Sequence, residues 1–241
     1  MATITDHASA NSTSSGATLS LTVTASVGDM LVLACAADNA GASGVSSTSA
    51  SITDAAGNTW TSRSQVNYTP GGAADDGTTL RIWTCAVTSA LSSATITINF
   101  SPNTASKAAI LKKIVPAAGE KIEFVAVDAT GTTVTGTALD APTVSVAQGQ
   151  TIFGFGTLES NGPGTADSDT TNGSWSTDYN SSASTGTAAT SQAIGGQHKT
   201  VTATGNQTYG RTGNNRDRAA NYIILGYVSS GSAAGTSTVS G

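Results

Sequence analysis

Residues 19–37 decide the fold class, and they read Leu-Ser-Leu-Thr-Val-Thr-Ala-Ser-Val-Gly-Asp-Met-Leu-Val-Leu-Ala-Cys-Ala-Ala. The first six residues alternate apolar and hydroxyl side chains, which is the pattern of a β-strand with one buried face. Gly28-Asp29 then predicts a turn, and residues 30–37 form a continuous apolar run of strand length. Such a continuous run fits a strand covered on both faces, or a central strand of a β-sandwich.

The same patterns recur along the chain. Residues 105–115 also fit one face of a helix, but Pro116 would stop that helix at once, and we favour a strand there. The sequence therefore predicts an all-β fold: a two-sheet antiparallel β-sandwich, jelly-roll-like, with about ten short strands and long Gly/Ser/Thr loops. Beyond residues 19–37, strands are predicted at 59–63, 80–85, 94–100, 108–115, 122–127, 143–146, 151–158, 199–203 and 221–228.

Composition divides the chain into three segments. Residues 1–18 are expected to form an N-terminal arm, residues 19–228 the β-sandwich domain, and residues 229–241 a Ser/Gly/Ala-rich C-terminal tail. Ordering the backbone costs about 1–2 kcal/mol per residue, and the tail has too little apolar surface to offset that cost. We therefore expect a partner subunit to order the tail.

Charge and the distribution of apolar residues argue against several classes of protein. Only 10% of the residues are charged, and ten Lys and Arg against fifteen Asp and Glu give a formal net charge of −5. A nucleic-acid-binding protein needs a basic surplus to neutralise phosphates, so no nucleic-acid partner is expected. No apolar run approaches the roughly 20 residues that span a bilayer, so no membrane is expected either. Residues 1–6 lack the basic and apolar regions of a secretory signal peptide.

Residues with catalytic chemistry are few and scattered. His7 and His198 are interpreted as solvated surface histidines, and the sequence has no Gly-x-Ser-x-Gly motif that would expose a nucleophilic serine. Only three glutamates occur, and their spacing singles out no acid–base pair for glycoside cleavage. We expect no enzymatic activity and no cofactor.

Residues 167–173, Asp-Ser-Asp-Thr-Thr-Asn-Gly, resemble a calcium-binding loop, with Asp178 where a final carboxylate could bind. Thr171 replaces the third acid, and the glycine falls one position late. We favour a polar turn without metal.

Two other short features have structural interpretations. Residues 54–58, Asp-Ala-Ala-Gly-Asn, predict a turn in which Asp54 accepts backbone hydrogen bonds, Gly57 takes a positive φ, and Asn58 tolerates a left-handed conformation. Cys35 and Cys85 are interpreted as buried reduced thiols, with a disulfide as the alternative if their strands are neighbours.

Basic residues gather in two short stretches of the chain. One interpretation is that the lysines keep a solvated sheet edge from pairing with other sheets. The other is that both groups dock onto an acidic protein surface. The candidate docking residues are Lys107, Lys112, Lys113, Lys121, Arg211, Arg216 and Arg218.

Several motifs together resemble a β-sandwich domain family of bacteriophage and bacterial surface proteins. In that family Gly-Asp precedes an apolar strand, as in residues 28–37, and a Thr-Asp-x-x-Gly-Asn-x-Trp segment follows, as in residues 53–60. Residues 80–84, 94–100, 149–156 and 221–227 are also similar, so the resemblance spans residues 19–228. The stretch from Lys107 to Lys121 is more basic than the family pattern. The resemblance implies a jelly-roll-like fold and no catalytic residues.

Two functions fit these observations best. A bacterial carbohydrate-binding or adhesin module ranks third, because such a module normally carries an export signal or neighbouring domains. The leading hypothesis is a non-enzymatic structural protein of a bacteriophage virion, which decorates and cements the outer capsid surface by bridging capsomers. It would be assembled in the host cytoplasm, bind the major capsid protein and form a homotrimer. The alternative is a tail-fibre or tail-tip module that recognises a host surface glycan, although the sequence has no coiled-coil or β-helical shaft.

Overall fold

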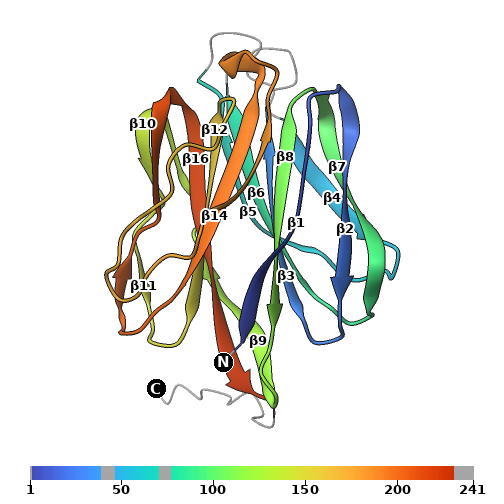
Figure 1. Cartoon of the computed structure of the whole chain (residues 1–241), viewed down its shortest axis with the longest axis vertical. Helices are drawn as coiled ribbons and strands as arrows, with labels where there is room; N and C mark the ends of the chain where they lie inside the picture. The colour runs from blue at the N-terminus through green and yellow to red at the C-terminus, as the bar shows by residue number, and fades with distance from the viewer. Residues whose placement is uncertain (1, 39–46, 71–76, 231–241) are drawn as a thin grey trace, which may run out of the picture.

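The computed structural model describes residues 2–38, 47–70 and 77–230, and it folds them almost entirely into β-strands (Figure 1). The all-β sandwich class is therefore confirmed. Within the described residues there is one short 3-10 turn, at Ala188–Thr190. The strands are β1 (Thr3–Ser12), β2 (Gly16–Ala25), β3 (Met30–Ala37), β4 (Thr48–Asp54), β5 (Thr61–Tyr68), β6 (Thr78–Ala86), β7 (Leu91–Thr104), β8 (Lys107–Val115), β9 (Glu120–Val127), β10 (Thr132–Asp140), β11 (Val144–Val146), β12 (Thr151–Glu159), β13 (Tyr179–Ala183), β14 (Gln192–Thr200), β15 (Gly205–Gln207) and β16 (Gly210–Ser229).

The first half of the chain, β1 to β8, pairs its strands in a nested order. β1 pairs with β8, β2 with β7 and β3 with β6, as if one long hairpin were rolled into two sheets. The resulting orders are β1-β8-β3-β6-β5 and β2-β7-β4. This is a jelly-roll arrangement. It has one variation, because β5 pairs with β6 instead of extending the second sheet beside β4.

The second half, β9 to β16, repeats this order. Its larger sheet runs β10-β16-β12-β14-β13, which corresponds strand by strand to β1-β8-β3-β6-β5, and its smaller sheet, β11-β15, corresponds to β2-β7. The extra strand β9 pairs with the last part of β16. The correspondence extends to sequence: Gly28-Asp29 precedes β3 and Gly149-Gln150 precedes β12, while Ala108-Ala109 on β8 matches Ala219-Ala220 on β16.

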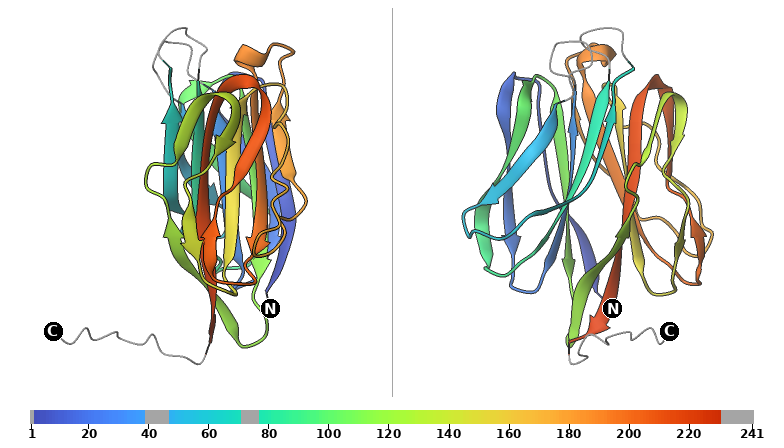
Figure 2. Two further views of the ribbon diagram at one scale, coloured as in Figure 1. Left: turned by 90° about the vertical axis from the view of Figure 1, so that its left-hand side faces the viewer. Right: turned by 180° about the vertical axis from the view of Figure 1, so that it is seen from behind.

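The two halves pack through their larger sheets with approximate two-fold symmetry. β8 contacts β14 while the equivalent β16 contacts β6, and β5 contacts β16 while the equivalent β13 contacts β8. Such reciprocal contacts between equivalent elements are characteristic of a two-fold interface. The sheets stack in four layers, with β2, β4 and β7 at one side of the molecule and β11 at the other (Figures 1 and 2). The described residues thus contain four sheets where two were expected, because periodicity locates strands but not their partners.

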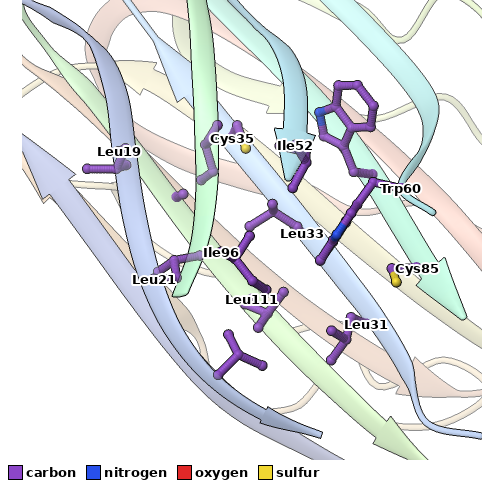
Figure 3. Close-up of a cluster of buried hydrophobic side chains, with 14 of the residues drawn as sticks. Leu19, Leu21, Leu31, Leu33, Cys35, Ile52, Trp60, Cys85, Ile96 and Leu111 are labelled. Atoms are coloured by element: carbon purple, nitrogen blue, oxygen red, sulfur yellow. The ribbon is translucent and has the colours of Figure 1, made fainter. Parts of the chain in front are cut away.

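Three hydrophobic cores fill the spaces between the layers. The first lies between the two sheets of the first half and contains Leu31, Leu33 and Leu111 (Figure 3). The second lies between the two larger sheets and contains Val32 and Phe153. The third lies on the far side of β12 and β16. Because neighbouring residues of β3 enter different cores, both faces of that strand are covered, which explains its continuous apolar run.

Several expected segments take a different form in the structure. Residues 3–12, assigned to an N-terminal arm, form β1 in register with β8. The strand predicted at residues 108–115, in preference to a helix, is confirmed as β8. Residues 161–196, where the sequence predicts no strand, include β13 and the start of β14, whose Ser, Asn and Gly residues carry little periodic signal. The expected tail lies almost entirely outside the described residues, which end at residue 230.

The Asp54 turn forms as expected, with one difference. Asp54 Oδ1 accepts the backbone N–H of Ala56 at 2.9 Å, Asp54 Oδ2 accepts the indole N–H of Trp60 at 2.9 Å, and Gly57 has a φ of +71°. Asn58 does not adopt a left-handed conformation. Its buried side-chain oxygen instead accepts the backbone N–H of Ser89 at 2.9 Å, which ties the turn to the β6–β7 connection.

The two cysteines are free and buried. Both thiols lie in the first core, where burial raises the pKa of each to about 12. The reduced-thiol interpretation is therefore confirmed, and the disulfide alternative is wrong. A thiol with so high a pKa carries almost no thiolate at neutral pH, so neither side chain is a reactive nucleophile.

Candidate functional site

Four of the seven predicted docking residues are buried, and this corrects the expectation that they bind a partner. Their side chains are inside the protein because each finds acceptors within its own chain, which sequence spacing does not reveal. A buried cation must be paired or hydrogen-bonded, since its desolvation is costly. The four are Lys107, Lys112, Arg211 and Arg218, exposed by 1%, 0%, 4% and 1%.

Lys107 and Arg218 are bound by backbone carbonyl groups. Lys107 Nζ donates to the carbonyls of Ser14 at 2.9 Å and Thr104 at 3.0 Å. The Arg218 guanidinium donates to the carbonyls of Gly136 at 2.8 Å and Asn214 at 2.7 Å. Both cations therefore tie connections to strands: Lys107 at the β1–β2 turn, and Arg218 where the register of β10 against β16 shifts.

Arg211 is the centre of a buried ionic network in the second half. Its guanidinium makes a two-point ion pair with Asp178, at 2.6 and 3.0 Å, and donates to the hydroxyl of Tyr209 at 2.9 Å. Gly156 and Gly195 lie opposite each other on β12 and β14, and a Cβ added at Gly195 would fall 2.5 Å from the guanidinium. These glycines therefore leave the space that Arg211 fills, so the network has a structural role.

The remaining three cations do not form a shared patch. Lys113 is half-buried and donates to the carbonyl of Thr24 at 3.1 Å, while Lys121 pairs with Glu123 at 3.2 Å on the exposed side of β9. Arg216 is exposed near the start of β16, whereas Lys121 on β9 lies opposite Val228, near the end of β16. Twelve residues of strand separate Arg216 from Val228, which is about 40 Å.

The calcium-like loop already contains a cation of the protein itself. Lys199 Nζ donates to Asp169 Oδ2 at 2.8 Å, to the carbonyl of Thr171 at 3.0 Å and to Gln207 Oε1 at 3.1 Å. The lysine lowers the pKa of Asp169 to about 2. Among the described residues, no three His, Cys, Asp or Glu side chains come together as a metal site. Lys199 thus occupies the position that a bound cation would take.

The two histidines have different environments. His7 Nε2 accepts the backbone N–H of Thr24 at 3.1 Å at the edge of β2. His198 packs on Phe153 with ring centroids 5.7 Å apart, and burial together with the charge of Lys112 lowers its pKa to about 4. His198 is therefore not a solvated surface histidine. Its place on the buried strand β14 was hidden by the Gly-Gly-Gln sequence before it, which resembles a turn.

The carboxyl groups of Glu159 and Asp217 share a cavity of about 400 Å³, which Thr135 and Arg216 also line. Glu159 accepts the backbone N–H of Gly77 at 3.1 Å, and burial, aided by Asp217 and Asp38, raises its pKa to about 8. Glu159 is therefore protonated at neutral pH and hydrogen-bonds to Asp217. Glycoside-cleaving pairs stand about 5–9.5 Å apart to admit substrate or water. A directly hydrogen-bonded pair does not match that geometry.

The outer face of the β2-β7-β4 sheet is an uncharged surface, which we call the hydroxyl face. Alternation sends Leu19, Leu21, Ile96 and Ile98 inward and leaves hydroxyl and amide side chains outside. Strand register places them in rows, such as Ser20, Thr97 and Thr53 across the three strands. The face consists of Thr18, Ser20, Thr22, Thr24, Ser51, Thr53, Thr95, Thr97, Asn99 and Ser101.

Comparisons with known proteins give no relative for this chain. No family model, no curated protein and no solved structure matches it. In the part of the chain that the structure describes, no helix has the length and apolar character needed to cross a membrane.

Proposed function

We propose that the protein is a non-enzymatic structural protein of a bacteriophage virion, which decorates the capsid and binds the major capsid protein through the hydroxyl face. The observation that carries this proposal is the absence of charge across the outward side chains of β2, β4 and β7. Depletion of charged residues distinguishes the centre of a protein interface from the remaining surface. Hydroxyl and amide groups suit a wet, hydrogen-bonded contact of this kind.

The size of the hydroxyl face indicates how such a contact would be used. Three strands about 4.8 Å apart, with about eight residues each, cover roughly 400 Å². A stable interface buries about 800 Å² on each partner, so the face supplies about half of that area. A single contact would therefore be weak. A homotrimer that bridges capsomers would add several such contacts through effective concentration.

The role of the buried cations is consistent with a structural protein. Lys107, Lys199, Arg211 and Arg218 all bind acceptors of their own chain, and they hold turns and strands in place. Their side chains are therefore not placed at the contact with the capsid. The resemblance of residues 19–228 to phage and bacterial surface β-sandwich domains adds the virion context.

The proposal is tested with particles that contain or lack the protein. Particles without it are expected to release their genome at a lower temperature or under milder osmotic shock, and to adsorb to host cells as complete particles do. Loss of adsorption with unchanged particle stability would contradict the proposal and favour the glycan-binding tail fibre.

The contact surface is tested by adding charge to it. Ser20→Lys with Thr53→Lys places two exposed lysines on either side of Thr97, and we expect at least tenfold weaker co-sedimentation with capsids lacking the protein. The matched control is Ser145→Lys with Thr202→Lys, which adds the same charge at exposed positions of the second half. Equal binding by both double variants would refute the assignment of the hydroxyl face.

A further inference from the structure

Lys112 on β8 and Asp6 on β1 stand directly opposite each other in the antiparallel register. Opposed residues of an antiparallel pair point to the same side of the sheet, and here Lys112 Nζ contacts Asp6 Oδ1. The two residues are 106 positions apart in the chain. They therefore join the first and last strands of the first half.

The Lys112 amino group is poorly solvated as a cation. Its side chain is fully buried, and among the described residues its hydrogen-bond partner is Asp6 alone, with the Tyr179 ring 5.6 Å away. An ammonium group has three N–H donors, and each buried donor without an acceptor is costly. Burial lowers the pKa of Lys112, while Asp6 opposes that shift. Burial therefore destabilises the Lys112 ammonium relative to the neutral amine.

Other buried lysines of the chain lack this combination. Lys199 also pairs with an aspartate, but its ammonium has two further oxygen acceptors, Thr171 O and Gln207 Oε1. Lys107 has two carbonyl acceptors and no carboxylate among its hydrogen-bond partners. Only Lys112 among these three combines a carboxyl contact with an otherwise unsolvated amino group.

Two further titratable side chains, His198 and Asp178, act electrostatically on the pair. His198 faces this region from β14, and the charges of Lys112 and Asp6 both act on its pKa of about 4. It is therefore a neutral imidazole at neutral pH, and its Nδ1 is buried without a hydrogen-bond partner. Asp178 is also near, but it is held by Arg211. The Asp6 side chain is 33% exposed, which leaves a path to solvent for a small leaving group.

We propose that Lys112 and Asp6 form an intramolecular amide bond that cross-links β8 to β1. The ammonium first passes a proton to the carboxylate, which yields a neutral amine and a carboxylic acid. The Nζ lone pair then attacks Cγ of Asp6 and forms a C–N bond. A C–O bond breaks, and the hydroxyl leaves with a proton from nitrogen as water. One amine and one acid give one amide and one water, so the step needs no oxidant or further reactant.

Two physical effects favour the reaction. The strands hold the amine against the carboxyl group, and well-oriented intramolecular reactions reach effective molarities of about 10⁵–10⁸ M. The product is neutral, so it removes the desolvation cost of a buried charge pair. The cross-link would close the first half covalently, independently of whether the protein belongs to a capsid.

The mass of the intact, denatured full-length protein tests the proposal directly. The mass is expected to be lower than the sequence mass, with or without Met1, by one water molecule. Trypsin cannot cut after an acylated lysine, and residues 1–62 contain no Lys or Arg. Digestion should therefore give residues 1–63 joined to residues 108–113. A full sequence mass, with both peptides recovered separately, would overturn the proposal.

Two variants distinguish this bond from other losses of water. Lys112→Arg keeps the charge pair, but its guanidinium stays protonated and does not attack the Asp6 carboxyl group. The variant should therefore have its full sequence mass. Lys199→Arg is the matched control at the other buried Lys–Asp pair, and it should keep the deficit of one water. A deficit that survives Lys112→Arg would place the dehydration elsewhere and refute the cross-link.

Discussion

The two halves of the molecule share one strand order but fill the space behind their larger sheets differently. Behind β3 and β8 the first half packs Leu31, Leu33 and Leu111 against the β2-β7-β4 sheet. Behind β12 and β14 the second half has Gly156 and Gly195, with Arg211 lying across them. One topology can therefore be held together mainly by apolar packing, or by an apolar core combined with a buried ionic network, and the two differ in how they respond to substitution and pH.

The largest effect is expected from breaking the ionic network. Arg211→Ala leaves Asp178 and Tyr209 without their partner, and removal of one member of a buried pair typically costs about 3–5 kcal/mol of unfolding free energy. Chemical denaturation measures this loss. Arg211→Met combined with Asp178→Leu should recover a large part of it, because no unpaired charge remains. A loss below about 1 kcal/mol for Arg211→Ala would contradict a structural role for the network.

A somewhat smaller effect is expected in the apolar core of the first half. Leu33 is fully buried, and Leu33→Ala should cost about 3 kcal/mol through lost contacts and the cavity it leaves. The loss should be the same at acidic and alkaline pH, because no titratable group is removed. Leu33→Met, which nearly conserves volume, is the control and should cost less than about 1.5 kcal/mol. A strongly pH-dependent loss would contradict the view that the first half is stabilised mainly by apolar packing.

The smallest effect concerns the carboxyl pair of the second half. Glu159 has a pKa near 4.5 when unfolded and about 8 in the fold, so between these values the folded state binds more protons. Stability therefore falls as pH rises through this window, and the full penalty is present above about pH 8. Glu159→Gln has no such proton to lose. Above this window the free energy of unfolding of Glu159→Gln should exceed that of the wild type by on the order of 1–3 kcal/mol. This is less than the full shift would give at about 1.4 kcal/mol per pKa unit.

Denaturation curves at about pH 5 and pH 9 measure the difference. Glu123→Gln, at an exposed glutamate of β9, is the control and should follow the wild-type profile. Parallel pH profiles for Glu159→Gln and the wild type would show that Glu159 is ionised in the fold throughout.

Sequence periodicity located the strands more successfully than their partners. The alternation at residues 19–24 and the apolar run at residues 30–37 correspond to β2 and β3, because burial on one face or both leaves a direct mark on residue type. The repeat of the jelly-roll order was missed, since Gly-Gln before β12 matches Gly-Asp before β3 in only one residue. β1 was missed because it has few apolar residues to show a period.

Functional residues were harder to identify for a physical reason. Lys and Arg are expected at the surface, yet Lys107, Lys112 and Arg218 are buried because distant segments supply their acceptors. Such long-range pairing leaves no local pattern. The hydroxyl face, in contrast, can be predicted in part, because the serine and threonines that alternate with Leu19, Leu21 and Val23 must point away from the core that these apolar residues define.

The packing of one larger sheet on the other has a consequence for how the chain emerges during synthesis. Once β1 to β8 have left the ribosome they can pair, but the apolar face carrying Val32, Ile82 and Ile110 is covered by strands of the second half, chiefly β12, β14 and β16. At about 5–20 residues per second, the next 114 residues take roughly 6–23 s. For that time a nascent chain presents an uncovered apolar sheet to its surroundings. Holding this face apart from other nascent chains is the main hazard of building the molecule from two successive jelly rolls.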